Sequence, residues 1–311
     1  MDFANEKQLE IADMALFEQY FDSYPPQISE FTFTNLFIWR FNYELLFTEW
    51  KNHLLVFSKT YLKSDSENDA EQNTPYFFFP PIGENPSQLI IKLFRELKNL
   101  EFHRVPKTLI NSLKAQFQDD MDNLGLKIHE DRDNWDYVYK RESLVNLEGN
   151  KYRNKRRYLE TFKEQYDYEF HLISEEWLDD CRKLQDKWCD IKNCQKNEDI
   201  HQEHIAVQEA FDNYEELGYN GGLILVDGKP AGYTIGERLN EDTVVIHIEK
   251  AHTYYEGSYQ AINNLFAKKC CDNIKFVNRE QDLGIPGLRK SKKSYHPHHM
   301  IKKYIIEVSP P

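Results

Sequence analysis

The feature that most constrains the fold is the segment GLILVDGKPAGYTIG at residues 222–236. Two runs of strand-forming residues flank Asp227-Gly228, and this pair favours the type I′ turn of a two-residue β-hairpin. DTVVIHIEKA at 242–251 predicts a third strand, SYQAINNLFAKKCC at 258–271 a helix, and IKFVN at 274–278 a further strand. Three helices are expected before the hairpin, at 151–166, 175–194 and 199–218, and a last strand at 303–308.

The first half of the chain has a similar order of elements without obvious residue identity. NYELLFTEW and HLLVFSKT predict a hairpin around Lys51-Asn52, and YFFFPP at 76–81 predicts a third strand after a polar loop at 62–74. Residues 85–100 have the apolar stripe of a helix, and FHRV, a helix from Pro106 and WDYVYKR follow. Because 311 residues exceed the usual size of one domain, this weak repeat indicates two tandem copies of one α+β fold, at 1–145 and 146–311.

No segment reads as a membrane span or a targeting peptide. The start MDFANEKQLE lacks a cationic and then apolar region, and no apolar run approaches the roughly 18 residues of a membrane helix. We therefore expect a cytoplasmic protein with no integral membrane segment. The five cysteines are odd in number and confined to the second half, which favours reduced thiols over a disulfide framework.

Neither a metal nor a tightly bound cofactor is predicted. Cys189, Cys194, His201 and His204 are spaced C-x4-C-x6-H-x2-H, which departs from the usual closed zinc sites, so ordinary helix residues are the favoured interpretation. The sequence also lacks a Walker loop, a Rossmann glycine fingerprint and a G-x-S-x-G elbow. These absences argue against a kinase, a dehydrogenase and a hydrolase of those types.

Charge is unevenly distributed along the chain. The net charge of −13 argues against DNA as a partner and against non-specific binding to an anionic membrane. KYRNKRR at 151–157 nevertheless carries five Lys or Arg residues and no acid, and residues 285–303 carry six and no acid. The alternatives are a solvated basic surface and a local site for an anionic carrier or small-molecule substrate.

The segment VNREQDLGIPGLRKSKKSYHPHHM at 277–300 is the main candidate site. Asn278, Arg279, Glu280 and Asp282 directly follow an apolar strand, where ligands of open α/β sheets commonly bind. Arg279 is suited to clamp a carboxylate or phosphate. The alternative is a structural role, in which Asp282 caps the turn and Arg279 pairs with Glu280.

Two glycines and a run of cations follow in the same segment. Gly284 and Gly287 flank a tight turn that can direct backbone N–H groups outward. If the next residues are helical, Arg289 and either Lys292 or Lys293 lie close enough to share one phosphate or carboxylate. We therefore favour an anion-binding role for this turn over a solvated loop.

Three segments resemble the phosphatidylglycerol lysyltransferase C-terminal-like family: FTFTNLFIWR at 31–40, IEKAH at 248–252 and VNREQDLGIPGLRKSKKSYHP at 277–297. The order of hairpin, third strand, helix and strand resembles the GCN5-related N-acetyltransferase (GNAT) fold. Two such units in tandem resemble the aminoacyl-tRNA-dependent Fem-type transferases. The resemblance implies two tandem GNAT-like domains and transfer of an aminoacyl or acyl group to an amine or hydroxyl. The sequence shows no counterpart of the transmembrane region of the full membrane synthases.

Acyl transfer needs a base, a donor for the developing oxyanion and a site for the carrier. Glu249, Glu280 and Asp282 are candidate bases, and Tyr295 is a candidate for protonating the leaving group. The alternative for Glu249 is a structural ion pair with Lys250 or Arg238.

The resemblance also assigns a carrier site to the helix that follows the third strand. In the acetyltransferase-like fold this helix directs its N-terminus at the carrier pyrophosphate, which gives that role to Gly257 and Ser258. Acetyl-coenzyme A enzymes usually have a second glycine at this turn, whereas HTYYEGSYQA has one. Acyl-coenzyme A is therefore the weaker candidate co-substrate, beside aminoacyl-tRNA.

The basic segment at 151–157 is a candidate tRNA patch. In a Fem-like transferase such a patch receives the acceptor end of a charged tRNA, and neighbouring tyrosines are available for stacking. The alternative is a solvated helix that offsets the acidic surface. The cations of this patch are Lys151, Arg153, Lys155, Arg156 and Arg157.

Together these features predict an acyl or aminoacyl transferase whose site lies in the second half, with the first half as scaffold or acceptor platform. The competing interpretation is a non-catalytic anion-binding module that keeps the acetyltransferase-like fold. An acid within reach of a bound acyl carbon distinguishes the two, because only the enzyme requires it.

Overall fold

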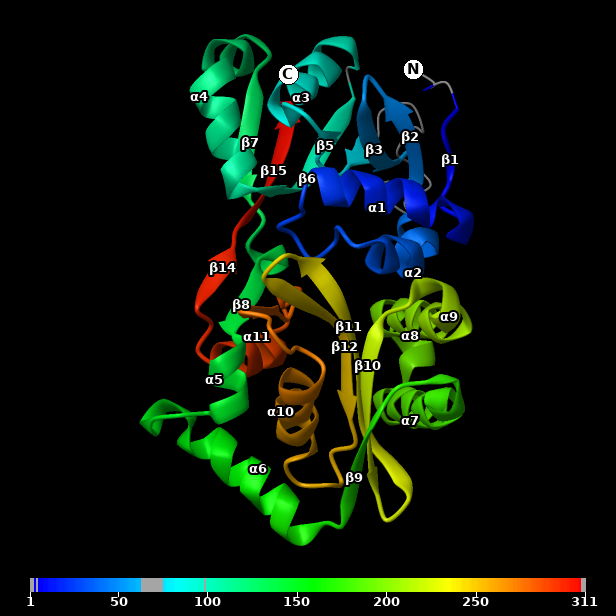
Figure 1. The fold of residues 1–311 in the computed structure, drawn as a ribbon. Coiled ribbons are helices and arrows are strands. Elements are labelled where there is room, and N and C mark those ends of the chain that lie inside the picture. Colours follow the sequence, from blue (N-terminus) through cyan, green and yellow to red (C-terminus); the bar gives the residue numbers. More distant parts are fainter. Residues whose placement is uncertain (1–2, 4, 63–74, 98, 309–311) are drawn as a thin grey trace. The chain divides into compact units, whose positions relative to one another are not determined.

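The computed structural model describes residues 3, 5–62, 75–97 and 99–308 (Figure 1). The chain divides into two compact units, Met1–Trp135 with Ile301–Pro311 and Asp136–Met300. Each unit contains one mixed sheet with helices, which confirms the α+β prediction. Most of the expected polar loop at 62–74 lies outside the described residues. Within the described residues, no helix combines the length and apolarity needed to span a membrane.

The sheet of the first unit has the strand order β1-β2-β3-β4-β6-β15-β7, with β5 paired to β3. β4 and β6 run parallel, whereas β15 is antiparallel to both β6 and β7. The predicted hairpin is confirmed, because β2 and β3 pair around Lys51 and Asn52, which both have positive φ. The strands are β1 (Lys7–Gln8), β2 (Leu46–Trp50), β3 (His53–Ser58), β4 (Tyr76–Phe78), β5 (Ile82–Gly83), β6 (Leu100–Pro106), β7 (Leu126–Glu130) and β15 (Lys303–Val308).

Among the described residues of the first unit there are four α-helices, and two of them were predicted. α3 (Pro86–Glu96) and α4 (Lys107–Asn123) pack with β3, β4 and β6 around one apolar core. α1 (Met14–Ser23) and α2 (Phe33–Tyr43) were not predicted. α2 begins after Thr32, whose Oγ1 accepts a hydrogen bond from Asn35 N at 3.1 Å. Its first six residues are all buried, so no amphipathic period marks the helix.

The second unit has the strand order β14-β8-β13-β12-β11-β10-β9. The hairpin of β10 and β11 turns at Asp227 and Gly228, both with positive φ, as predicted. β12 is antiparallel to β11 and parallel to β13. The strands are β8 (Asp136–Lys140), β9 (Tyr168–Leu172), β10 (Asn220–Val226), β11 (Lys229–Asn240), β12 (Thr243–Ala251), β13 (Phe276–Asn278) and β14 (His299–Ile301).

Helices cover both faces of this second sheet, with α10 on one face and α7 and α8 on the other (Figure 1). Gly236 of β11 lets α10 approach, because an added Cβ would lie 3.1 Å from the ring of Phe266. Tyr233 of the same strand faces α7 and donates to Gln185 at 2.7 Å. The helices are α5 (Arg141–Asn146), α6 (Arg153–Gln165), α7 (Glu175–Lys192), α8 (Glu198–Asp212), α9 (Tyr214–Leu217), α10 (Ser258–Lys269) and α11 (Pro286–Lys293).

The unit boundaries differ from the expected ranges 1–145 and 146–311 at both ends of the second unit. β8 pairs with β13, so the second unit begins at Asp136. β15 pairs with β6 and β7, so the last strand completes the sheet of the first unit. Pairings between strands so far apart in the chain leave no local signal in the sequence.

The expectation of reduced cysteines is wrong for one pair, because Cys189 and Cys194 form a disulfide. α7 ends at Lys192, and Asn193 adopts the left-handed conformation, which reverses the chain. The Cα atoms of the two cysteines are therefore 5.1 Å apart. An odd cysteine count does not reveal such a local pairing.

Candidate functional site

The segment after β13 is held by Asp282, whose side chain is fully buried. Its carboxylate accepts hydrogen bonds from Arg289 Nε at 2.9 Å and Nη2 at 2.7 Å. It also accepts from Tyr137 Oη at 2.6 Å and from Gly284 N at 3.0 Å. Gly284 has a φ of 72°, which favours glycine at this turn. This geometry gives Asp282 a structural role and does not support its predicted role as a base.

Lys292 holds the same segment from inside the fold. It lies on α11, and its Nζ donates to the carbonyl oxygens of Arg279 and of Gln281, the second at 2.6 Å. Burial lowers the pKa of Lys292 to about 8. Tyr139 Oη donates to the Lys292 carbonyl at 2.7 Å. Lys292 therefore positions the loop and does not present its charge to an outside ligand.

Glu280, another predicted base, is paired with a buried histidine. His247 Nδ1 lies 2.8 Å from Glu280 Oε1, and Nε2 lies 2.7 Å from Glu237 Oε1. Burial opposes the charge of His247, but the two glutamates outweigh it and raise its pKa to about 9. His247 is thus an imidazolium at neutral pH. Asn278 is also fully buried, accepts from Glu280 N at 2.8 Å and donates to Asp136 at 3.1 Å.

Glu249 and Arg279 form an ion pair where β12 and β13 separate. The pairing of β13 with β12 is limited to Thr243–Val245 of β12, and Glu249 lies beyond that stretch. Arg279 Nη2 donates to Glu249 Oε1 at 2.7 Å, and Asn263 Nδ2 of α10 donates to Oε2 at 2.8 Å. The side chains of Glu249 and Arg279 are only 11% and 10% exposed. This pairing replaces the two structural alternatives considered from the sequence.

Two buried atoms beside this ion pair have no hydrogen-bond partner among the described residues: Arg279 Nη1 and Asn263 Oδ1. An unsatisfied buried polar group costs roughly 1–3 kcal/mol, so a water molecule or a ligand is expected at each. Arg279 offers a charged donor, which suits a carbonyl or carboxylate oxygen. Asn263 Oδ1 and the Glu249 carboxylate are acceptors, which suit an amine. The arrangement therefore matches a ligand with an ammonium group close to a carbonyl.

α6 brings Lys155 to the same place. Lys155 Nζ lies 4.1 Å from the ring centroid of Tyr295, and the Arg279 guanidinium lies 4.8 Å from that centroid. Burial and the positive charge of Arg279 lower the pKa of Lys155 to about 8. Tyr152, just before α6, donates from Oη to the Tyr295 carbonyl at 3.1 Å. The two basic segments singled out in the sequence therefore meet in the second unit.

Tyr295 itself is a poor proton donor in this environment. Its side chain is buried, and burial raises its pKa well above the ordinary value of 10. The phenol therefore keeps its proton more firmly than a solvated tyrosine does. Its ring instead provides an aromatic face for Arg279 and Lys155.

The other cations of the predicted tRNA patch divide into two groups. Arg156 donates to the carbonyls of Leu147 and Gly149, the second at 2.8 Å, and so holds the turn between α5 and α6. The remaining three are exposed to solvent. They are Lys151, Arg153 and Arg157.

The predicted carrier site at the start of α10 is filled by protein atoms. A Cβ added at Gly257 would lie 2.1 Å from the carbonyl oxygen of Tyr158, so α6 packs directly on this turn. Ser258 is buried, donates from N to Tyr255 O at 3.1 Å, and donates from Oγ to His252 O at 3.0 Å. The geometry therefore does not support an open pyrophosphate site at Gly257 and Ser258.

α11 instead borders an open pocket of about 510 Å³. Lys290 and Lys293 are exposed on it, so its wall is cationic. Gly287 does not line the pocket, and a Cβ added there would meet nothing within 4 Å. The lining residues are Gly284, Pro286, Arg289, Lys290, Lys293 and Ser294.

Sequence reasoning missed several residues of this site. Asn263 lies in the helix of which only the N-terminal residues Gly257 and Ser258 were predicted to bind a ligand, and Tyr139 lies in WDYVYKR, which was given no functional role. Asn263 could have been found from the sequence, because it is itself a polar residue within an otherwise apolar helix face. His247 and Glu237 become neighbours only because β12 carries a bulge at His247, where its pairing with β11 skips one residue.

Comparison with known proteins identifies the family. The model of the phosphatidylglycerol lysyltransferase C-terminal family matches residues 21–307. The chain belongs to this family. A conserved protein of unknown function from Bacteroides thetaiotaomicron is 29% identical, with a TM-score of 0.86 over 99% of this chain and 100% of that chain.

Two further solved structures show the fold at low identity. L-PGS from Bacillus licheniformis is 14% identical, with a TM-score of 0.62 over 98% of this chain and 93% of that chain. FemX is 8% identical, with a TM-score of 0.59 over 98% of this chain and 97% of that chain. These likenesses confirm the predicted tandem acetyltransferase-like fold.

Proposed function

We propose that this protein transfers an aminoacyl group from aminoacyl-tRNA to an amine or hydroxyl of an acceptor molecule in the cytoplasm. The observation that carries the proposal is that Arg279 Nη1 and Asn263 Oδ1, on either side of Glu249, have no hydrogen-bond partner in the part of the chain that the structure describes. In the proposed complex, Glu249 and Asn263 bind the α-ammonium group, and Arg279 binds the carbonyl oxygen. Membership of the phosphatidylglycerol lysyltransferase C-terminal family supports the reaction class.

The proposed reaction is attack by the acceptor nitrogen or oxygen on the ester carbonyl carbon. A new bond forms at that carbon, the bond to the ribose oxygen breaks, and one proton moves from the nucleophile to the leaving oxygen. Arg279 Nη1 stabilises the oxyanion that develops on the carbonyl oxygen. Lys155, with a pKa of about 8, is the proposed proton carrier, because a substantial fraction is neutral near physiological pH.

Cations outside this centre suit the phosphates of the carrier. Five of these cations are solvent-accessible: Lys290 and Lys293 on α11, Arg153 and Arg157 on α6, and Lys151 just before α6. They lie on the two segments that meet at Tyr295. A tRNA end bound along them would present its aminoacyl ester to the Glu249 centre. Acyl-coenzyme A is the second donor to test.

The test is a transfer assay with pure protein, radiolabelled aminoacyl-tRNAs and a mixture of small amines, alcohols and phosphatidylglycerol vesicles. We expect label to leave the tRNA and enter an amide or ester product. Arg279→Gln should reduce the rate about 10²-fold or more, as for loss of an oxyanion donor. Arg238→Gln is the matched control, because this exposed arginine bonds only nearby backbone carbonyls among the described contacts.

Lys155→Met should lower the rate and remove a rise in rate centred near pH 8. Binding of aminoacyl-tRNA without transfer to any acceptor would overturn the enzymatic proposal and favour the non-catalytic module. Transfer from acyl-coenzyme A alone would overturn the choice of donor.

A further inference from the structure

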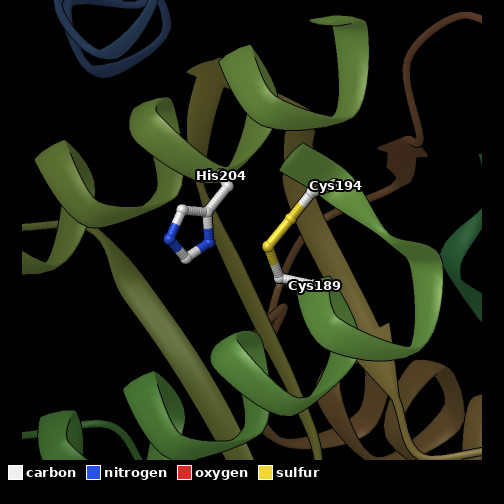
Figure 2. Close-up of side chains that lie close together, drawn as sticks. All are labelled: Cys189, Cys194 and His204. Atoms are coloured by element: carbon white, nitrogen blue, oxygen red, sulfur yellow. A yellow bond between two sulfur atoms is a disulfide. The ribbon is translucent and has the colours of Figure 1, made fainter. Parts of the chain in front are cut away.

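A second cluster of chemically active side chains lies in the second unit, outside the proposed transfer site. Cys189 stands near the end of α7, Cys194 in the short 3-10 helix Cys194–Lys196, and His204 on α8. Figure 2 shows the imidazole ring facing the two sulfur atoms. The ligand atoms of all three residues lie within 4.8 Å of one another. His201, which the sequence also suggested, is not part of this group.

These donor types and spacings suit a soft divalent cation. A tetrahedral Zn²⁺ ion holds thiolate and imidazole ligand atoms roughly 3.5–3.8 Å apart, given bond lengths of about 2.3 and 2.0 Å. The three ligand atoms lie within 4.8 Å of one another, and the two sulfur atoms, which are bonded to each other in this structure, move apart to such separations only after reduction. The four residues between Cys189 and Cys194 also fall within the usual range for a pair of zinc-binding cysteines.

The surroundings hold the cluster in place and leave it accessible. Cys194 is 1% exposed and forms the base of the cluster, whereas Cys189 and His204 are half-buried. Gln185 Nε2 contacts His204 Nδ1 at 3.4 Å, and Gln185 is itself fully buried and bonded to Tyr233. Gln185 thus fixes the imidazole in the disulfide form, and because its Nε2 is a donor, a metal bound to either ring nitrogen of His204 would replace or break this contact.

We propose that the reduced form of this protein binds one soft divalent cation of the Zn²⁺ class through Cys189, Cys194 and His204, with water as the fourth ligand. In this structure the two cysteines form a disulfide, which cannot supply two thiolates. A phosphine reductant and water break the S–S bond, giving two thiols and a phosphine oxide. Metal binding then releases the two thiol protons. Occupancy of the site is therefore linked to the redox state of the two cysteines.

Co²⁺ is the probe, because its thiolate complexes absorb in the near ultraviolet and its tetrahedral complexes absorb strongly in the visible. The full chain is reduced with a phosphine, treated with a chelator, desalted and titrated with Co²⁺. We expect one Co²⁺ per chain with a thiolate charge-transfer band, and displacement by Zn²⁺. Cys189→Ser should abolish the band, and His204→Gln should weaken binding at least about tenfold, as expected for loss of one ligand.

His201→Gln is the matched control, since His201 lies one helical turn away on α8 and is not in the cluster. Its Co²⁺ affinity should equal that of the wild type. Circular dichroism checks that each variant is folded, and the half-buried positions 189 and 204 are chosen to keep it so. The proposal is overturned if the reduced wild type shows no charge-transfer band at equimolar Co²⁺, or if folded Cys189→Ser keeps the same band.

Discussion

Arg279 and Glu249 carry opposite charges at a depth where neither is solvated by bulk water. The desolvation of two such charges often exceeds their mutual attraction, so a buried pair is not by itself stabilising. Here Asn263 adds a second hydrogen bond to the carboxylate, whereas Arg279 Nη1 has no partner among the described residues. A buried guanidinium with one N–H group left over is better explained by ligand binding than by packing, because that N–H can donate to a ligand.

The ion pair predicts a strong energetic coupling. Arg279→Met should lower the free energy of unfolding by about 3–5 kcal/mol, because it leaves Glu249 buried without its counter-charge. The double variant Arg279→Met with Glu249→Gln should cost less than the sum of the single variants, by about 1–3 kcal/mol. Urea unfolding of the four proteins measures this coupling.

The more exposed pair Arg182 and Asp212 serves as a control for that cycle. Its coupling should stay below about 1 kcal/mol, as for surface ion pairs. If the costs at Glu249 and Arg279 simply add, the two side chains do not interact as the structure describes.

At the residue level, the sequence indicated which residues belong to the site but not which residues they contact. Glu249 and Arg279 were singled out because they end a strand or follow one, and the structure brings them together. Asp282 was singled out on the same grounds and Lys292 for its helical spacing from Arg289, yet both are buried and hold their own loop. A charged residue that binds a ligand and one that holds a loop in place can have the same charge and the same spacing in the sequence. They differ in whether the fold supplies a partner for each polar atom, because Arg279 Nη1 has none among the described residues, and this depends on the whole unit.

Among the elements, β12 shows most clearly what local patterns cannot reveal. Strict alternation along DTVVIHIEKA would assign each side chain to a face, but the bulge at His247 shifts the assignment beyond it. Glu249 therefore reaches α10, while Lys250 lies over Trp188 of α7. The hairpin at Asp227-Gly228 was predictable because turn chemistry is local. The bulge was not predictable, because the residues that His247 contacts there, Glu237 and Glu280, lie 10 and 33 positions away in the chain.

The raised pKa of His247, the residue at the bulge, predicts that the free energy of unfolding depends on pH. His247 has a pKa of about 9 in the fold against an ordinary 6.5, so protonation favours the folded state. This stabilisation is complete below pH 6.5 and is lost as pH rises through 9. The shift corresponds to about 3 kcal/mol for this buried group. The free energy of unfolding should therefore fall more between pH 6 and 9.5 in the wild type than in His247→Gln, measured by urea titration. Parallel pH curves for the two proteins would show that His247 is not held as a cation.

For the whole molecule, the sequence predicted the tandem α+β organisation but not which sheet each of the outlying strands joins. The order of elements repeats in both halves, and this was enough to predict the fold that the comparisons confirm. The return of β15 to the first sheet and the place of β8 in the second are long-range pairings. The residues of the proposed transfer centre all belong to the second unit, whose fold brings α6, α10, β12 and the segment after β13 together.

The central claim is that this centre recognises an aminoacyl group. It is tested most directly by comparing the affinity of the protein for an aminoacyl-tRNA and for the same tRNA uncharged. We expect the charged form to bind at least about tenfold more tightly, a difference of about 1.4 kcal/mol. Arg279→Gln should remove this difference, and Arg238→Gln should keep it. Equal affinity of the wild type for the charged and uncharged tRNA would contradict the claim.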